Sequence, residues 1–261
     1  MSRTWKFSDL EFMAQWETLK QDYLPDPFVY TCRTWSNEDY VREKADALAR
    51  VRRARDRSFD DALEAVAYPD IRIVAESWDE CEPQRLDRLI RLHGVRQGER
   101  GYVVSELAGE SFWHSGGFTV TECDAVDLAA AVVRALPEVA GGSRAEVVLS
   151  TRDEGAELDY FYGRSHVLES FDRSGADHST SFLDLPTSRV GTIDVIQGRS
   201  RFGPRGITRH RLEWRDVRDD GRYVIDDRTP PVAVGADASR LIGTINSRVA
   251  AVIRAIKDEW V

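Results

Sequence analysis

The sequence predicts an α+β fold in which a central antiparallel β-sheet carries packed helices. Three observations support this: apolar residues change from a helical period to a period of two near residue 70, the connections between the following strands are short, and the order of elements repeats in the second half. Short connections favour hairpins over the long crossovers of parallel strands. Neither half buries a sheet well alone. We therefore expect one domain over residues 1–261, with pseudo-repeats at about 1–140 and 141–261 in a quasi-two-fold arrangement.

The N-terminal part is predicted to contain three helices. Ser8 and Glu11 have the spacing of a capping box at the start of the first helix. The prolines of LPDPFVY then favour an extended segment, after which a second helix begins at Ser36 and a short third helix at Ser58. The basic stretch RVRRARDR is spread around a helix axis and flanked by acids, so we expect a solvated, salt-bridged surface there.

Strands and a closing helix follow in each half. In the first half, strands are predicted over residues 70–79, 88–97, 101–109 and 111–123, and a helix capped by Asp124 ends near Pro137. In the second half, a strand at 144–150 and a mixed, largely helical region up to about Pro186 precede strands at 190–198, 206–216, 221–227 and 230–234. A last helix, capped by Asp237, corresponds to the helix that closes the first half.

The composition is that of a folded, acidic protein. Hydrophobic residues make up 42% and charged residues 31% of the 261 positions, which excludes global disorder. The formal net charge of −9 at pH 7 repels nucleic acid and anionic lipid, so we expect no nucleic-acid partner. No Lys follows a Gly, which excludes a glycine-rich phosphate-binding loop ending in Gly-Lys.

The sequence also predicts where the chain acts. It has no apolar run of about 18 residues, and MSRTWKFSDLEF lacks the apolar stretch of a signal peptide. We therefore expect no membrane insertion and a cytoplasmic location. Cys32, Cys81 and Cys123 are an odd number without CxxC spacing, so we expect buried, reduced thiols and neither a disulfide framework nor a thiolate zinc site.

No residue pattern identifies a reaction. The string His114–Gly117 could place backbone N–H groups beside an imidazole, but no GxSxG motif supplies a nucleophile, so we interpret it as a strand kink. The five histidines, at 93, 114, 166, 178 and 210, lack the close spacing of metal ligands, and no GxGxxG is present. We expect no cofactor and no metal. Two alternatives stay open: a small-molecule enzyme with His114 or His210 as base in a cleft, or a regulatory or structural subunit.

Six features spread along the chain carry a resemblance to a known family. They are an opening helix ending in Trp16, the segment LPDPFVY, a charged helix after it, a strand ending at Ser77–Trp78–Asp79, the segment GVRQGERGYVVSELAG and the late LEWRDVRDDGRY. Together they resemble the EspG family, the secretion-associated chaperones of mycobacterial-type type VII (ESX) systems. The resemblance implies a cytosolic, non-enzymatic protein that binds helical PE–PPE heterodimers, without nucleotide or metal. We expect a PE/PPE-like heterodimer as partner, and a monomer or weak homodimer.

The resemblance also implies a binding surface made of the loop after the family's second strand, one sheet face and the C-terminal helices; in this chain the loop is the one that follows the strand predicted at 70–79. The loop residues are Trp78, Asp79, Glu80, Glu82 and Gln84. The helix corresponds to residues 237–260. Because the loop is short and acidic, its client needs a basic rim.

A second candidate surface is RSRFGPRG, residues 199–206, the pseudo-symmetric counterpart of the acidic loop. Phe202 lies there beside Arg201 in a Gly/Pro-containing connection. The aromatic ring either projects as an apolar anchor or tucks back onto the protein, and the sequence leaves both alternatives open.

Overall fold

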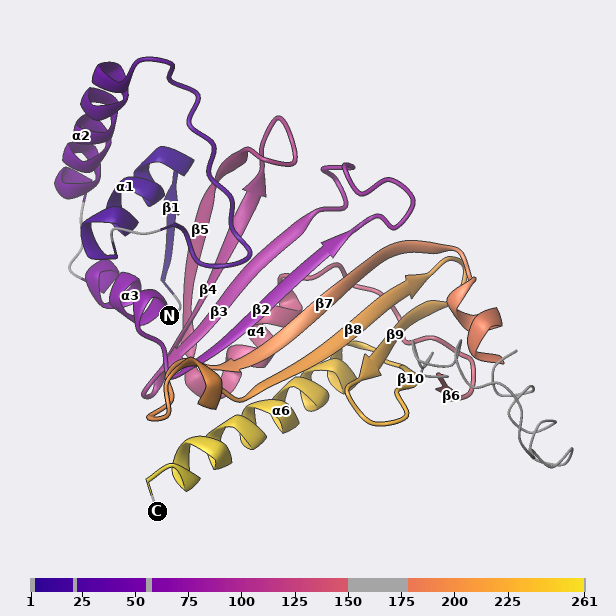
Figure 1. Ribbon diagram of the computed structural model, residues 1–261. Helices are drawn as coiled ribbons and strands as arrows, with labels where there is room; N and C mark the ends of the chain where they lie inside the picture. Colours follow the sequence, from indigo (N-terminus) through magenta and orange to yellow (C-terminus); the bar gives the residue numbers. More distant parts are fainter. Residues whose placement is uncertain (1–2, 21–22, 55–57, 150–177, 261) are drawn as a thin grey trace, which may run out of the picture.

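The computed structural model describes residues 3–20, 23–54, 58–149 and 178–260, and its elements are arranged around one large sheet (Figure 1). In the first half the strands are β1 (Thr4–Phe7), β2 (Ile71–Trp78), β3 (Ile90–Gln97), β4 (Arg100–Ala108) and β5 (Ser115–Asp124). In the second half they are β6 (Val147–Val148), β7 (Thr187–Gln197), β8 (Arg209–Val217), β9 (Gly221–Asp226) and β10 (Val232–Gly235). The helices are α1 (Asp9–Leu19), α2 (Asn37–Ala54), α3 (Ser58–Ala67), α4 (Leu128–Arg134) and α6 (Ala238–Asp258), and residues 178–183 are also helical.

The ten strands form one sheet in the order β1-β5-β4-β3-β2-β7-β8-β9-β10-β6, and each neighbouring pair is antiparallel. The predicted α+β fold with a central antiparallel sheet is therefore confirmed. The two halves meet at β2 and β7, where Ile71 pairs with Gln197 and Trp78 with Val190. Outward from this central pair, each half adds its next three strands in chain order and then a helix, α4 or α6. This repeated order is the predicted quasi-two-fold arrangement.

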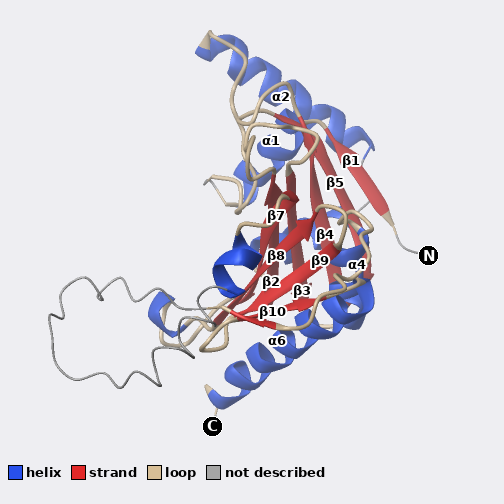
Figure 2. Cartoon of the chain, turned by 90° about the vertical axis from the view of Figure 1, so that its right-hand side faces the viewer, coloured by secondary structure: helices blue, strands red, loops and turns tan. Residues whose placement is uncertain are grey.

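Two apolar cores hold the helices on the sheet. The α4–α6 core joins both of these helices to one face through buried residues such as Ile73, Val132 and Ile245. The second core packs α1 and α3 against the first half of the sheet, with Phe12 and Phe118 stacked at 4.4 Å between ring centroids. Figure 2 shows α1 and α2 at one end of the molecule, and α4 and α6 along the other side of the sheet. Each large apolar side chain buried this way contributes about 1.5–3 kcal/mol.

Two of the three helix caps predicted from the sequence are present in the structure. The Ser8–Glu11 capping box is present, with both reciprocal hydrogen bonds. The Asp237 carboxylate accepts a hydrogen bond from the Arg240 backbone N–H and caps α6 as predicted. Asp124 makes no side-chain capping hydrogen bond, because a short 3₁₀ turn, Ala125–Asp127, separates it from α4. Here the expected cap is wrong.

Other predictions differ from the structure in detail. Strand β1 was not predicted, and it pairs with β5 at the sheet edge. The strand expected at 144–150 is reduced to the two residues of β6. Cys32 and Cys81 are exposed, so the expectation of buried thiols is wrong for both. Most of the mixed region expected before Pro186 lies outside the described residues. The kink expected at His114–Gly117 is present, because the β4–β5 register shifts at Leu107/Ala108 and Gly117 has a φ of 123°.

Candidate functional site

The loop between β2 and β3, residues 79–89, is held at its base by Asp79. Asp79 is only 3% exposed, and its Oδ1 accepts hydrogen bonds from the backbone N–H groups of Cys81 at 2.9 Å and Glu82 at 3.0 Å. The bond from Glu82, and after it the bond from Cys81, lowers the pKa of Asp79. The Asp79 carboxylate is therefore charged at neutral pH. Asp79 therefore shapes the loop from inside and does not belong to its exposed rim.

Glu80 connects the same loop to the second half of the sheet. Its Oε2 accepts hydrogen bonds from Thr187 Oγ1 at the start of β7 and from Arg215 Nη2 in β8, each at 2.9 Å. Arg215 Nη2 also donates to the carbonyl of Leu183 at 2.9 Å. Because three segments meet at this contact, Glu80 anchors the loop, although its side chain remains 46% exposed.

The tip of the loop is open to solvent. Glu82, Pro83 and Gln84 are exposed and line a shallow hollow with Arg85. Arg85 is paired with Asp87 at 2.8 Å. The loop thus presents a carboxylate and an amide on a base that Asp79 and Glu80 hold in place.

Trp78, the last residue of β2, lies half-buried on the face opposite the α4–α6 core, because Ile71, Ile73 and Ala75 of the same strand point into that core. We call this surface the open face. It is defined by the residues of the central strands that alternate with the α4–α6 core: Arg72, Glu76 and Trp78 of β2, Thr192 and Asp194 of β7, and Arg209, Arg211 and Glu213 of β8.

An arginine pair on the open face surrounds one buried carboxylate. Asp194 accepts two hydrogen bonds from Arg209, at 3.0 and 2.6 Å, and two from Arg211, at 2.9 and 2.8 Å. Burial raises the pKa of Asp194, but these bonds outweigh burial and leave its pKa below the usual range. Both arginine side chains are 51% exposed, so the open face presents cations on β8, two strands from β2 and level with Arg72 and Val74, toward the end of β2 that is opposite the acidic loop. This pair was not predicted from the sequence, although Arg209 and Arg211 alternate along β8 with residues on the face of the buried Leu212.

The counterpart loop between β7 and β8, residues 198–208, is fastened to the end of α6. Glu259 accepts hydrogen bonds from Gln197 Nε2 at 2.7 Å and from the Arg201 backbone N–H at 2.9 Å, and Arg201 Nη1 donates to the Glu259 carbonyl at 2.9 Å. The Arg201 guanidinium also lies 4.8 Å from the centroid of the Trp260 ring. Phe202 is 73% exposed, so the alternative in which it tucks back onto the protein is wrong.

The apolar stripe of helix α6 packs inside the protein. Leu241, Ile245 and Val252 are fully buried in the α4–α6 core. Its outward side is polar and includes Arg240, which lies 3.4 Å from Glu146. A partner that contacts the predicted helix 237–260 would meet its exposed polar residues, the partly buried Ile253 and Ile256, and Trp260, which is 72% exposed.

Comparison with known proteins places this arrangement in a family. A model described as the EspG family matches residues 8–247. The chain belongs to the EspG family. A search of curated proteins gave no match. Among solved structures, this EspG-family chain is similar to one titled as the Mycobacterium tuberculosis type VII secretion system chaperone EspG5 in complex with a PE25–PPE41 dimer, with a TM-score of 0.50 and 13% identity, covering 99% of this chain and 96% of that one. At such low identity the likeness shows a common fold.

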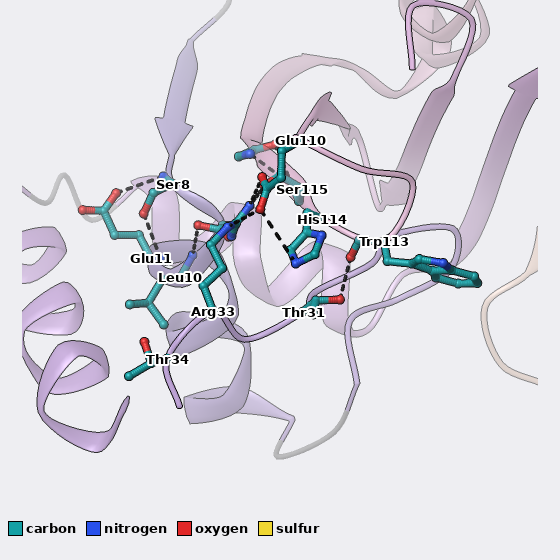
Figure 3. A network of polar contacts seen from close by, with 12 residues as sticks. Ser8, Leu10, Glu11, Thr31, Arg33, Thr34, Glu110, Trp113, His114 and Ser115 are labelled. Atoms are coloured by element: carbon teal, nitrogen blue, oxygen red, sulfur yellow. Dashed lines mark hydrogen bonds and ion pairs between the residues drawn. The ribbon is translucent and has the colours of Figure 1, made fainter. Parts of the chain in front are cut away.

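The histidines offered as catalytic alternatives are engaged in this EspG-family chain. His114 Nδ1 is hydrogen-bonded to Ser111 Oγ at 2.6 Å, and its Nε2 lies 3.8 Å from Glu110 (Figure 3). His210 Nδ1 lies 3.1 Å from Asp227 Oδ2. Within the described residues there is no group of three or more side chains able to hold a metal ion, and no helix long and apolar enough to cross a membrane. His166 lies outside those residues.

Proposed function

We propose that this chain is a type VII secretion chaperone that binds a helical PE/PPE-like heterodimer in the cytoplasm and directs it to the secretion machinery. The observation that supports this most directly is membership of the EspG family, together with a fold matched over 99% of the chain to a chaperone in complex with a PE25–PPE41 dimer. The function involves no catalytic step and no cofactor.

The client-binding surface consists of the β2–β3 loop tip, Trp78 and the adjoining open face. The acidic tip favours a client with a basic rim, and Arg209 and Arg211 favour an acidic group where the client crosses the sheet. Trp78 supplies an apolar contact between these two regions. Its half-buried ring offers the type of anchor that carries much of the affinity in protein interfaces.

The loop favours binding because its base is already ordered. Asp79 fixes the turn at Cys81 and Glu82, and Glu80 fixes the loop to β7 and β8. A preorganised loop loses little conformational entropy on association. Asp79 and Glu80 therefore position the loop, and Glu82 and Gln84 make the contacts.

The test is co-expression with a PE/PPE-type heterodimer, followed by size-exclusion chromatography and calorimetric titration of the purified partners. Reversing the tip with Glu82→Lys and Gln84→Lys should slow association and change its salt dependence, because the tip would then repel a basic rim. Glu64→Lys, an exposed change on α3, is the matched control and should leave binding unchanged. Glu80 is unsuitable for this reversal because it anchors the loop.

Two further variants test separate parts of the surface, the Trp78 anchor and the counterpart loop. Trp78→Ala should weaken binding by about 2 kcal/mol, and its melting temperature shows whether the lost packing inside the chain is responsible. Phe202→Ala tests the counterpart loop, since its exposed ring contributes little to the core. Unchanged affinity in the tip variant would remove the β2–β3 loop from the interface, whereas failure of every PE/PPE-type heterodimer to co-purify would contradict the chaperone function itself.

A further inference from the structure

The side chains of the open face are sorted by chemistry along the direction of its strands. In the three central strands β2, β7 and β8, which lie side by side in Figure 1, the backbone register aligns the residues of this face in rows. Neighbouring rows are two residues, or about 7 Å, apart. Counted from the β2–β3 loop, the rows are Trp78–Val190–Arg215, Glu76–Thr192–Glu213, Val74–Asp194–Arg211 and Arg72–Ile196–Arg209.

The first row offers an apolar contact and little free charge. Trp78 is half-buried and Val190 is buried. Arg215 is only 12% exposed, and it donates hydrogen bonds to Glu80 and to the Leu183 carbonyl. A partner therefore meets the Trp78 ring in this row, and the charge of Arg215 is already balanced.

The second row, which we call the acidic row, carries two carboxylates. Glu76 and Glu213 lie on either side of Thr192. Glu76 is partly buried and Glu213 is exposed, and within the part of the chain that the structure describes neither carboxylate forms a hydrogen bond or an ion pair. The acidic row thus presents negative charge to a partner.

Two arginines act electrostatically on Glu76, but both are bonded to other carboxylates. Arg91, the register partner of Glu76 in β3, donates to Glu106 at 2.8 Å, and Arg211 donates two hydrogen bonds to Asp194. Burial raises the pKa of Glu76, and the two arginines offset this shift only in part. A cation supplied by a partner would therefore meet a carboxylate that is short of positive charge.

The third and fourth rows, which we call the cationic rows, have the opposite charge. Arg211 and Arg209 both bond to Asp194, and the side chain of each is still 51% exposed. Arg72 adds a third guanidinium, whose Nε has no hydrogen-bond partner among the described residues. Three guanidiniums and one carboxylate leave these rows positive. Over about 20 Å of strand the open face thus changes from apolar to acidic to cationic.

We propose that the open face recognises the order of side chains along one helix of the client. Counted from the β2–β3 loop, this helix places an apolar residue on Trp78, an Arg or Lys on the acidic row and an Asp or Glu on the cationic rows. The inference rests on the proposed function and adds the charge pattern of the client. Client residues at i, i+4 and i+8 are about 6 Å apart along a helix, so each can reach the next row. A helix with the opposite charge order would place like charges together and is rejected.

The test exchanges charges between rows without changing the net charge of the chain. In the double variant Arg211→Glu, Glu213→Arg, Asp194 keeps its two hydrogen bonds from Arg209. Calorimetric titration with a co-purified PE/PPE-type heterodimer should show binding at least about tenfold weaker than that of the unchanged chain. Glu213→Lys alone should weaken binding several-fold. Glu64→Lys, the matched control on α3, changes the net charge equally and should leave the affinity unchanged.

A reciprocal change in the client completes the test. Exchanging the basic and the acidic residue of its contacting helix should weaken binding to the unchanged chain and restore binding to the double variant. Because Glu213 is exposed, Glu213→Lys decides the result if the double variant melts at a lower temperature than the unchanged chain.

The outcomes separate this inference from the proposed function. The inference alone is overturned if the heterodimer binds the unchanged chain but binds the folded row variants with the same affinity. It is also overturned if Glu64→Lys weakens binding as much as Glu213→Lys, since net charge would then explain the effect. If no PE/PPE-type heterodimer binds the unchanged chain, the chaperone function is overturned as well.

Discussion

The buried ion pair between Arg222 and Asp216 offers the sharpest test of how the second half is held together. Arg222 in β9 is 2% exposed and donates to both carboxylate oxygens of Asp216 in β8, at 2.7 and 3.0 Å. It also donates to the Pro137 carbonyl at 3.2 Å and lies 4.4 Å from the centroid of the buried Trp214 ring. One guanidinium thus joins two strands to the segment that follows α4.

Replacing Arg222 with Met keeps much of the apolar contact with Trp214 but leaves the Asp216 carboxylate, itself 2% exposed, without its cation. An uncompensated buried charge of this kind costs about 3–5 kcal/mol. In a chain of this size each kcal/mol lowers the melting temperature by about 2–4 °C, so we expect a decrease of roughly 6–20 °C. Because total stability is about 5–15 kcal/mol, the Arg222→Met variant retains only part of it.

The assay is urea unfolding followed by circular dichroism, with thermal melts alongside. The double variant Asp216→Leu, Arg222→Met removes both charges and should recover most of the lost stability, since an apolar pair can replace a buried ion pair at little cost. It also provides a folded reference if the single variant does not fold. The reasoning is refuted if Arg222→Met loses less than about 1 kcal/mol, or if the double variant is no more stable than the single one.

Three further predictions concern titration, capping and metal ions. Burial lowers the pKa of His93 from 6.5 to about 4. Its stability contribution is therefore fully present above pH 6.5 and is lost as the pH falls toward 4, because the unfolded chain then takes up a proton that the folded chain excludes. Urea unfolding at each pH should show a loss of about 3 kcal/mol in the unchanged protein, and this loss should be absent in His93→Leu. Asp237→Ala removes the cap of α6 and should lower stability by about 1 kcal/mol, whereas Asp124→Ala, at a position without a capping bond, should change it by less than half of that in the same melts. Chelation with EDTA should leave the melting temperature unchanged, because we expect no structural metal. A fall of several degrees would contradict this expectation, since a structural metal contributes on the order of 10 kcal/mol where present.

Local signals in the sequence were sufficient for most of the fold. Ser8 and Asp237 cap their helices because each capping bond involves residues three apart in the chain. The hairpin strands were predictable because short connections constrain neighbours to pair. β1 was missed because a strand of four residues with polar Thr4 and Lys6 gains its stability only from pairing with β5, which lies far away in the sequence.

The candidate site was predicted less completely, for the same reason. An acidic loop is visible in the sequence, but the inward turn of Asp79 and the contact of Glu80 with Thr187 and Arg215 depend on segments from the other half. The sequence therefore located the loop but did not separate the residues that position it from those at its exposed tip, such as Glu82.

The pairing of β2 with β7 has a consequence for biosynthesis. β2 leaves the ribosome long before β7, and until Gln197 is available to meet Ile71 its hydrogen-bonding edge has no partner on that side. Unpaired strand edges promote aggregation, and pairing between distant segments slows folding. The chain therefore passes through a vulnerable interval during its own synthesis, when the five strands β1 to β5 have been made but β7 has not. Translation speed across residues 128–197 thus becomes a variable that governs the yield of folded protein.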